Sequence, residues 1–214
     1  MRLHRAILGL ATALAASWFL GNGAPPTQAY IDVPPRTLGH MCSYSSDIAV
    51  LKVESVHPEK KAVVFRQVQV LRGKWPAEAV RHFVVSKDVV PLLQVAKPGM
   101  TAVTFYTKTD HNAGYTYIGG LWYVNRLFVI DSKVQNDVGK WEAYLARPSQ
   151  LRTFSGEAAP LITAVTAILK GEEVVVPCMV ADKNEDLAAG RGKAKNLRAS
   201  LKRHEYDPKR DAAD

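Results

Sequence analysis

The sequence contains very little cysteine, with only two among its 214 residues, Cys42 and Cys178. This excludes a disulfide-rich scaffold, and no Cys-x-x-Cys pair or haem-attachment motif is present. Signatures of catalysis are missing too, since the chain has no Gly-x-Ser-x-Gly elbow and no His-Glu-x-x-His zinc helix. We therefore expect a protein that is not an enzyme. A hydrolase built around Ser43, Asp47 and His40 is a weaker alternative.

Long apolar runs are absent except at the N-terminus. Residues 6–20 form an apolar run of about 15 residues behind Arg2 and Arg5, in the length and charge order of a secretory signal peptide. Small residues and prolines follow and predict cleavage after Ala29; a membrane anchor is the alternative. We expect residues 1–29 to be a signal peptide and the mature protein to be secreted or periplasmic, with no transmembrane span.

Basic residues outnumber acidic ones, 28 to 20, and the formal net charge is +8. Much of the excess lies between Ala188 and Arg210, where eight basic residues stand against Glu205 and Asp207. This stretch belongs to a tail, residues 182–214, which we expect to be partly disordered or helical. The eight basic residues are Arg191, Lys193, Lys195, Arg198, Lys202, Arg203, Lys209 and Arg210. Because the body between Tyr30 and Leu187 is close to neutral, no nucleic-acid groove is predicted. The tail would contact anionic surfaces electrostatically.

Alternating apolar residues predict strands along most of residues 30–181. The strongest are 46–57, which carries a bulge or a change of face, and 61–73, which forms a hairpin with it. Further strands are expected at 79–86, 89–96, 101–109 and 174–180, with an aromatic hairpin at 115–130 around Gly119 and Gly120. Helical spacing is found only at 136–148 and 156–171. Strands followed by helices indicate an α+β domain, a small antiparallel barrel with two or three appended helices.

The segments "CSYSSDIAVLKVESVHPEKKAVVFRQVQVLRGKWP" and "KPGMTAVTFY" resemble bacterial secreted domains of the netrin/tissue-metalloprotease-inhibitor type. The resemblance implies an OB-like barrel. In the animal inhibitors an N-terminal cysteine binds the protease metal through its free amine, but cleavage after Ala29 leaves residues ahead of Cys42. The resemblance therefore implies the barrel and not the inhibition. The segments "RPSQLRTFSG" and "GEEVVVPCM" resemble uncharacterised secreted proteins of planctomycete-type bacteria, which implies no activity.

The cysteine in "VVVPCMV" has three interpretations: half of a disulfide, a soft metal ligand, or core packing. In an exported protein an even pair favours a Cys42–Cys178 disulfide. Closing a loop of about 136 residues, it would stabilise the fold by roughly 4–5 kcal/mol. The metal alternative is a copper site in a small redox protein, because copper favours sulfur with imidazole. Its ligands would be His40, Met41, Cys42, Cys178 and Met179. His57, His82 and His111 are expected to be surface or hydrogen-bonded histidines.

Aromatic residues make up 8% of the sequence and are concentrated in its middle. An exposed aromatic face on a barrel would bind sugars or peptides by stacking, and core packing is the alternative. The residues of this hypothesis are Tyr106, Tyr115, Tyr117, Trp122 and Tyr123. We therefore expect an exported, non-catalytic binding or interaction module without a cofactor. Its partner would be an envelope or extracellular protein or a glycan.

Expression of the full chain in a Gram-negative host tests the predicted export. Because Ala29 is a small residue at the cleavage position, we expect a mature protein that begins at Tyr30. Intact-mass measurement of the periplasmic fraction reports that start. The Ala29→Arg variant should stay uncleaved. A full-length, membrane-bound wild-type chain would instead show that residues 6–20 are an anchor.

Overall fold

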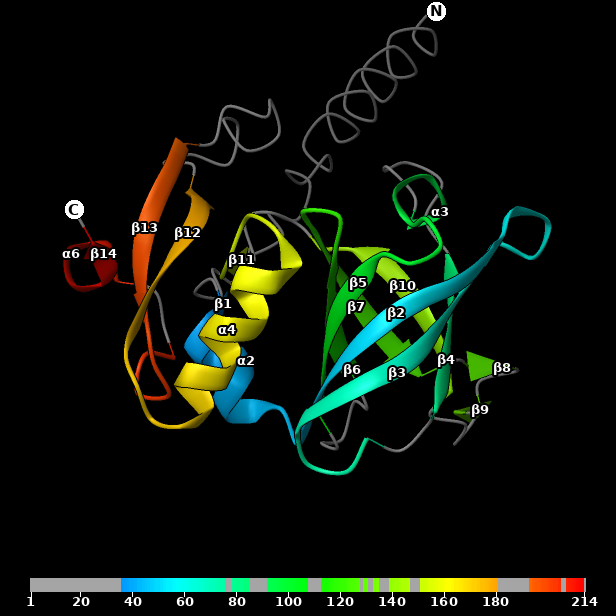
Figure 1. The fold of residues 1–214 in the computed structure, drawn as a ribbon, viewed down its shortest axis with the longest axis horizontal. Coiled ribbons are helices and arrows are strands. Elements are labelled where there is room, and N and C mark those ends of the chain that lie inside the picture. Colours follow the sequence, from blue (N-terminus) through cyan, green and yellow to red (C-terminus); the bar gives the residue numbers. More distant parts are fainter. Residues whose placement is uncertain are drawn as a thin grey trace, which may run out of the picture. The chain divides into compact units, whose positions relative to one another are not determined.

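A computed structural model of the chain describes residues 36–75, 78–84, 92–107, 113–127, 129–130, 133–134, 139–146, 151–180, 193–204 and 207–213. Within these ranges seven strands form a closed barrel in the order β10-β4-β3-β2-β5-β6-β7 (Figure 1). The strands are β2 (Asp47–His57), β3 (Ala62–Arg72), β4 (Ala79–Val84), β5 (Thr101–Tyr106), β6 (Ala113–Ile118), β7 (Leu121–Leu127) and β10 (Lys140–Leu145). The predicted α+β barrel is confirmed.

Three further sheets and several short helices accompany the barrel. The sheets pair β1 (Arg36–Thr37) with β11 (Leu151–Arg152), β8 (Val129–Ile130) with β9 (Lys133–Val134), and β12 (Val174–Val180) with β13 (Lys193–Ala199) and β14 (Ala212–Ala213). The helices are α2 (Leu38–Tyr44), α3 (Leu92–Val95), α4 (Ala158–Leu169), α6 (Pro208–Asp211) and the 3-10 turn η1 (Pro58–Lys60). Among the described helices, none is long and apolar enough to cross a membrane.

The hairpins predicted from alternation are confirmed. Strands β2 and β3 pair antiparallel, and register shifts along β2 are the bulges that the sequence indicated. Strands β6 and β7 join through Gly119 and Gly120, whose φ angles of 58° and 82° suit a tight two-residue hairpin turn. Before β5, Met100 N donates to Lys97 O at 3.0 Å and closes the expected turn.

Strand β10 corrects the prediction of a helix at residues 136–148. Trp141, Tyr144 and Leu145 have helical spacing, but the same segment also alternates, since Trp141 and Ala143 are buried between half-buried neighbours. Pairing with β7 on one side and β4 on the other decides in favour of the strand. The β4–β10 pairing is parallel, so the barrel is mixed and the expected purely antiparallel barrel is not confirmed.

Three other segments differ from expectation. Residues 92–95 form the helical turn α3 and not a strand, with Ala96 N donating to Leu92 O at 2.8 Å; Pro91 directly precedes it in the sequence. Helix α2 was not predicted; Thr37 caps it by accepting from His40 N at 3.0 Å. The region expected to be a basic tail contains strand β13 and the short elements α6 and β14.

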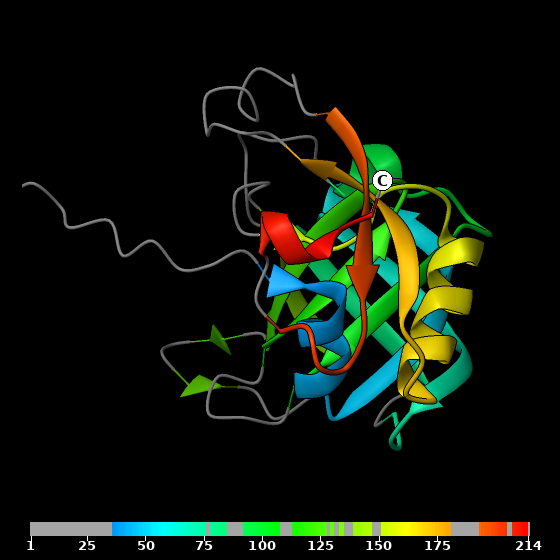
Figure 2. The ribbon, with the colours of Figure 1, turned by 90° about the vertical axis from the view of Figure 1, so that its left-hand side faces the viewer.

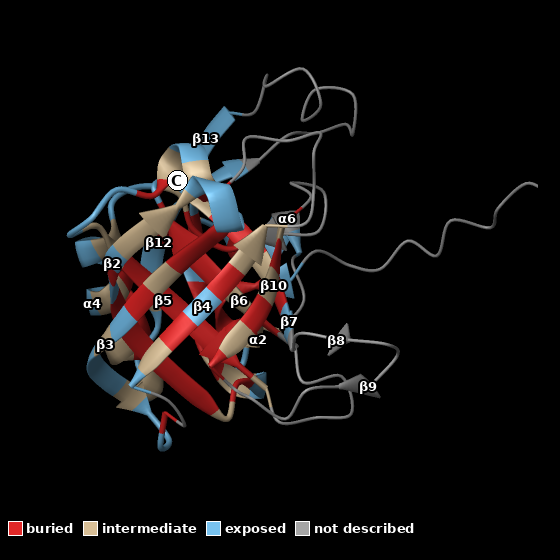
Figure 3. Cartoon of the chain, turned by 90° about the vertical axis from the view of Figure 1, so that its right-hand side faces the viewer, coloured by how far each residue is buried: buried red, intermediate tan, exposed pale blue. Residues whose placement is uncertain are grey.

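The barrel wall separates two hydrophobic clusters. The inner one fills the barrel with side chains such as Leu51, Phe65 and Trp141. The outer one lies between strands β5–β7 and helices α2 and α4, and includes Phe105 and Leu161. Figure 3 shows the buried positions, in red, along the barrel strands. Neighbouring residues of β6 and β7, such as Trp122 and Tyr123, belong to different clusters, as the two faces of a sheet require.

Candidate functional site

The aromatic residues predicted to form a stacking face lie in the core. Tyr106, Tyr117, Trp122 and Tyr123 expose between 1% and 7% of their surface, and Tyr115 is half-buried. Tyr117 and Trp122 pack together in the outer cluster with ring centroids 4.8 Å apart. Tyr106 and Tyr123 point into the barrel. The core-packing alternative therefore describes these residues, and they provide no exposed stacking face.

The two cysteines lie in separate clusters and no disulfide joins them. Cys42 packs in the outer cluster from α2, whereas Cys178 packs against Leu197 of β13. The predicted Cys42–Cys178 disulfide is thus absent from the structure. The reason is topological, because β12 pairs with β13 in a separate sheet and does not return to the barrel.

The five residues of the copper hypothesis are not brought into one site. Helix α2 buries Met41 and Cys42 in the core and leaves His40 half-buried. On β12 the alternation buries Cys178 and leaves Met179 exposed. In the part of the chain that the structure describes, no group of three or more His, Cys, Asp or Glu side chains is placed to hold a metal ion.

An aromatic and imidazole cluster lies where α2 meets the turn after β13. We call His40, Ser43, Tyr44 and His204 the Tyr44 patch. Tyr44 is 57% exposed, and of the Phe, Trp and Tyr side chains whose burial is described it alone is exposed. Its ring stacks on that of His40, one helical turn earlier, with centroids 4.3 Å apart and planes at 18°. The ring of His204 meets Tyr44 edge-on at 5.6 Å.

Ser43 and His204 lie as close together as a nucleophile and its general base, but their hydrogen bonds do not direct the serine proton to the histidine. Ser43 Oγ lies 3.1 Å from His204 Nε2. Both atoms contact the Leu201 carbonyl, to which Ser43 Oγ donates at 2.9 Å and His204 Nε2 donates as well. A protonated Nε2 cannot accept the serine proton. The pair therefore links α2 to the turn after β13. Asp47, which the hydrolase hypothesis grouped with Ser43 and His40, accepts hydrogen bonds from Lys74 N at 2.9 Å and from Ser46 Oγ at 2.7 Å.

The charges around the patch are basic. Burial, together with the nearby charges of Arg36 and His204, lowers the pKa of His40 to about 4. His40 is therefore a neutral imidazole at pH 7. The exposed guanidinium of Arg36 lies 5.2 Å from the centroid of the Tyr115 ring, and Lys202 is exposed in the turn. The patch thus combines an uncharged ring platform with nearby cations.

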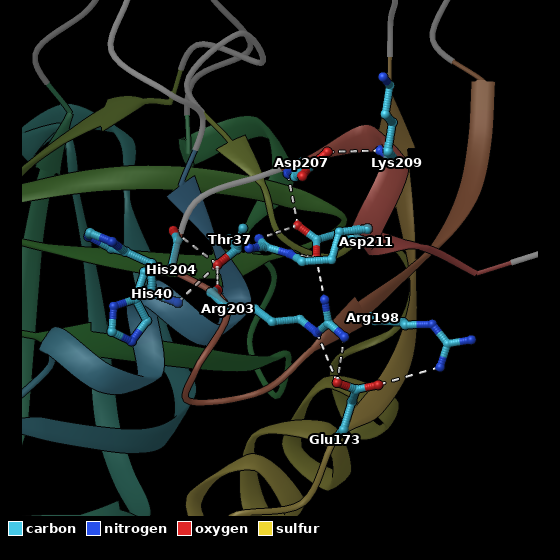
Figure 4. A network of polar contacts seen from close by, with 10 residues as sticks. Thr37, His40, Glu173, Arg198, Arg203, His204, Asp207, Lys209 and Asp211 are labelled. Carbon is cyan, nitrogen blue, oxygen red and sulfur yellow. Dashed lines mark hydrogen bonds and ion pairs between the residues drawn. The ribbon is translucent and has the colours of Figure 1, made fainter.

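An ion-pair network joins the turn after β13 to Glu173, which precedes β12, and to helix α6 (Figure 4). We call Glu173, Arg203 and Asp211 the clasp. Arg203 Nη1 lies 2.7 Å from Asp211 Oδ1, and Nη2 lies 2.8 Å from Glu173 Oε2. The Arg203 carbonyl accepts from Thr37 Oγ1 at the start of α2. Figure 2 shows the segments that meet here, α2, α6 and β12–β14. The clasp fixes the turn that carries His204.

The sequence indicated part of this site and missed the rest. His40 and Tyr44 are four residues apart, which on a helix places them on one face, so an expected helix at 38–44 would have paired them. His204 is far away in the sequence. No local pattern places it beside Tyr44, because the pairing of β13 with β12 does so.

No protein-family model, curated protein or solved structure matches the chain. The function is therefore argued from the residues and contacts of the Tyr44 patch.

The Asp211→Ala variant tests the clasp. Asp211 is buried, which raises its pKa, but hydrogen bonds from Arg210, the Asp207 backbone and Arg203 outweigh this and leave the pKa lowered. A lowered carboxylate pKa stabilises the fold above the unfolded value of about 3.9, and this stability is lost as the pH falls. We expect urea denaturation at pH 7 to show a loss of about 3 kcal/mol.

The difference between wild type and this variant should shrink below about pH 4. The matched control is Glu173→Gln, which removes an exposed partner of the same arginine and should destabilise the fold much less, because solvent screens that pair. A difference that stayed constant from pH 7 to about pH 2.5 would contradict the clasp.

Cys42 should be chemically inert in the folded protein. Burial raises the pKa of its thiol to about 12, although Arg72 acts in the opposite direction. The thiolate is the reactive form, so iodoacetamide at pH 8 should modify Cys42 only after urea unfolding. Peptide mapping measures this, with Cys42→Ser as the blank. Rapid labelling without urea, or a Cys42–Cys178 peptide in an unreduced digest, would refute the expectation.

Proposed function

We propose that the protein is an exported, non-catalytic binding module that recognises an anionic partner in the cell envelope through the Tyr44 patch. The observation that carries the proposal is the exposed ring of Tyr44, stacked on His40. Tyrosine is enriched among residues that dominate binding energy, because it gives a large contact area with few rotatable bonds. Stacking on His40 and the edge contact with His204 hold the ring in place before a partner arrives.

Electrostatics supports an anionic partner. Arg36 and Lys202 are exposed near the patch. Complementary charge steers association and excludes cationic partners. A flat ring platform favours a ligand that itself has a ring face. A saccharide with carboxylate groups meets both requirements, since its ring stacks on Tyr44 and its carboxylate pairs with Arg36.

Binding is supported over catalysis by the protons of Ser43 and His204. Both are directed at the Leu201 carbonyl, so the two side chains already have a structural role. Export rests on the signal peptide predicted for residues 1–29, which lie outside the described residues. The copper or redox alternative has less support, since Met41 and Cys42 are buried and Met179 is on the opposite face of β12 from Cys178.

We also infer that the barrel is an elaborated OB-like barrel. Strands β2, β3 and β4 form a meander, and the last barrel strand, β10, closes against β4 in parallel. Strands β5–β7 connect the meander to this closure. A small Greek-key barrel that binds ligands on its surface is the architecture of that fold. The inference agrees with the resemblance of residues 42–107 to OB-like secreted domains.

Calorimetric titration with oligogalacturonate tests the proposal. The purified mature protein should bind this carboxylated saccharide, and the affinity should fall with increasing salt. Tyr44→Ala should weaken binding about tenfold, because it removes the stacking surface. Arg36→Gln should weaken it less and reduce the salt dependence.

Val68→Ala serves as the control, because it removes an exposed apolar side chain of β3 outside the patch. This variant should bind like the wild type. Polyglutamate carries the same carboxylates without a ring and should bind more weakly. Equal binding by Tyr44→Ala and wild type, or no binding to either polymer, would refute the proposal.

A further inference from the structure

A serine, a histidine and a glutamate lie together at the turn between β2 and β3 (Figure 1). We call Ser55, His57 and Glu59 the turn triad. Ser55 Oγ lies 2.8 Å from His57 Nε2, and His57 Nδ1 lies 3.6 Å from Glu59 Oε1. A hydroxyl nucleophile, a base and a group that orients the base are arranged in this order where serine side chains take up acyl groups.

The local backbone explains why the three side chains meet. Ser55 and His57 are two residues apart on β2, so they point to the same face of the sheet. Val56, between them, packs against the inner cluster, so the face that they share is the outer one. The strand then ends in the 3-10 turn η1, which Lys61 closes in the left-handed region at a φ of 49°. This turn brings Glu59 back beside His57.

The protons of the turn triad are arranged differently from those of Ser43 and His204. A carboxylate beside Nδ1 favours the imidazole tautomer with its proton on Nδ1, which leaves Nε2 as an acceptor. Among the described residues, Ser55 Oγ has no hydrogen-bond partner other than His57 Nε2. The serine proton is therefore directed at the histidine, whereas Ser43 Oγ donates to the Leu201 carbonyl.

The turn triad is open to a reagent from solvent. The side chains of His57 and Glu59 are 38% and 64% exposed, and Ser55 is half-buried. Directly opposite Ser55 on β3 is Val64, which is half-buried on the same outer face and offers an apolar surface to a short acyl group. An ester with a good leaving group needs the least further stabilisation from the protein. Activated esters are therefore the class of reagent that suits this open group.

We infer that Ser55 is a covalent acylation site for activated esters, with His57 as its general base and Glu59 as the positioning residue. Ser55 Oγ bonds to the ester carbonyl carbon, and the serine proton passes to His57 Nε2. The bond between that carbon and the leaving oxygen then breaks, and the leaving oxygen takes the proton from Nε2. The products are the serine ester and the free alcohol of the reagent.

Acylation of Ser55 goes beyond the proposed binding function and does not depend on it. The turn triad shares no residue with the Tyr44 patch, so failure of the anionic-ligand experiment leaves the acylation site unaffected. Uptake of a single acyl group by each chain requires no turnover, and it is therefore compatible with a module that is not an enzyme.

Incubation of the purified protein with p-nitrophenyl acetate tests the inference. Peptide mapping should locate an acetyl group on Ser55, and the Ser55→Ala variant should lack it. Because activated esters also acetylate lysines, hydroxylamine treatment is needed to distinguish Ser55 from Lys60 and Lys61. Hydroxylamine cleaves a serine ester and leaves a lysine amide intact. Acetyl groups found on lysines alone would overturn the inference.

His57→Gln tests the general base. If His57 takes the serine proton, its loss should slow the acetylation of Ser55 about a hundredfold. Urea denaturation should show nearly the same stability as the wild type, because His57 lies at the surface. The Ser43 peptide is the internal comparison: Ser43 Oγ also lies 3.1 Å from a histidine, but its proton is directed elsewhere, so it should stay unlabelled. Equal rates in His57→Gln and wild type, or equal labelling of Ser43 and Ser55, would overturn the inference.

Glu59→Gln tests the positioning residue. Without the carboxylate, His57 should shift from the Nδ1–H tautomer towards the Nε2–H tautomer, and acetylation should slow less than in His57→Gln. Nitrogen NMR shifts of the imidazole ring measure the tautomer. The matched control is Glu54→Gln, which removes an exposed carboxylate of β2 that pairs with Arg66 and should change neither quantity. An unchanged tautomer and an unchanged rate in Glu59→Gln would overturn the role of Glu59.

Discussion

Strand β10 is the constraint on which the rest of the structure depends. It pairs antiparallel with β7 and parallel with β4, and these two pairings turn a row of strands into a barrel. Without β10, both β4 and β7 would be open edges with unpaired backbone groups. Its inward residue Trp141 contacts Tyr106 from the opposite part of the sheet, so closure and packing of the interior reinforce each other.

A closed barrel determines where later segments of the chain can pair. The closed barrel has no free strand edge, so β12, which follows α4, cannot add to it. Strand β12 pairs with β13 in a separate sheet. That choice separates Cys178 from Cys42 and removes the basis of the expected disulfide. It also brings the turn that follows β13 against α2, where the clasp holds it. The Tyr44 patch is therefore a consequence of barrel closure and of the second sheet together.

The predictable part of the fold is the part governed by local pattern. Alternation located β2–β3 around the Pro58–Lys60 turn and β6–β7 around Gly119 and Gly120, because a hairpin is decided by adjacent residues. The segment containing Trp141 satisfied helical and strand spacing at once, and only distant partners decided between them. The segment around β13 was expected to be a tail because basic residues are concentrated there. Lys193, Lys195 and Arg198 are indeed exposed, but exposed side chains do not prevent the backbone of a strand from pairing with β12.

The site was less predictable than the fold for a related reason. Aromatic residues are equally suited to a core and to a binding face, so the sequence did not show whether Tyr117 and Trp122 are buried or exposed. In the fold they are buried in the outer cluster with residues of α4. The Tyr44 patch could not be found from that pattern either, because its exposed ring is placed by helix α2 and its neighbour His204 by the turn after β13. Since the patch is solvated and near cations, an anionic partner of the proposed kind would pair with it at little desolvation cost.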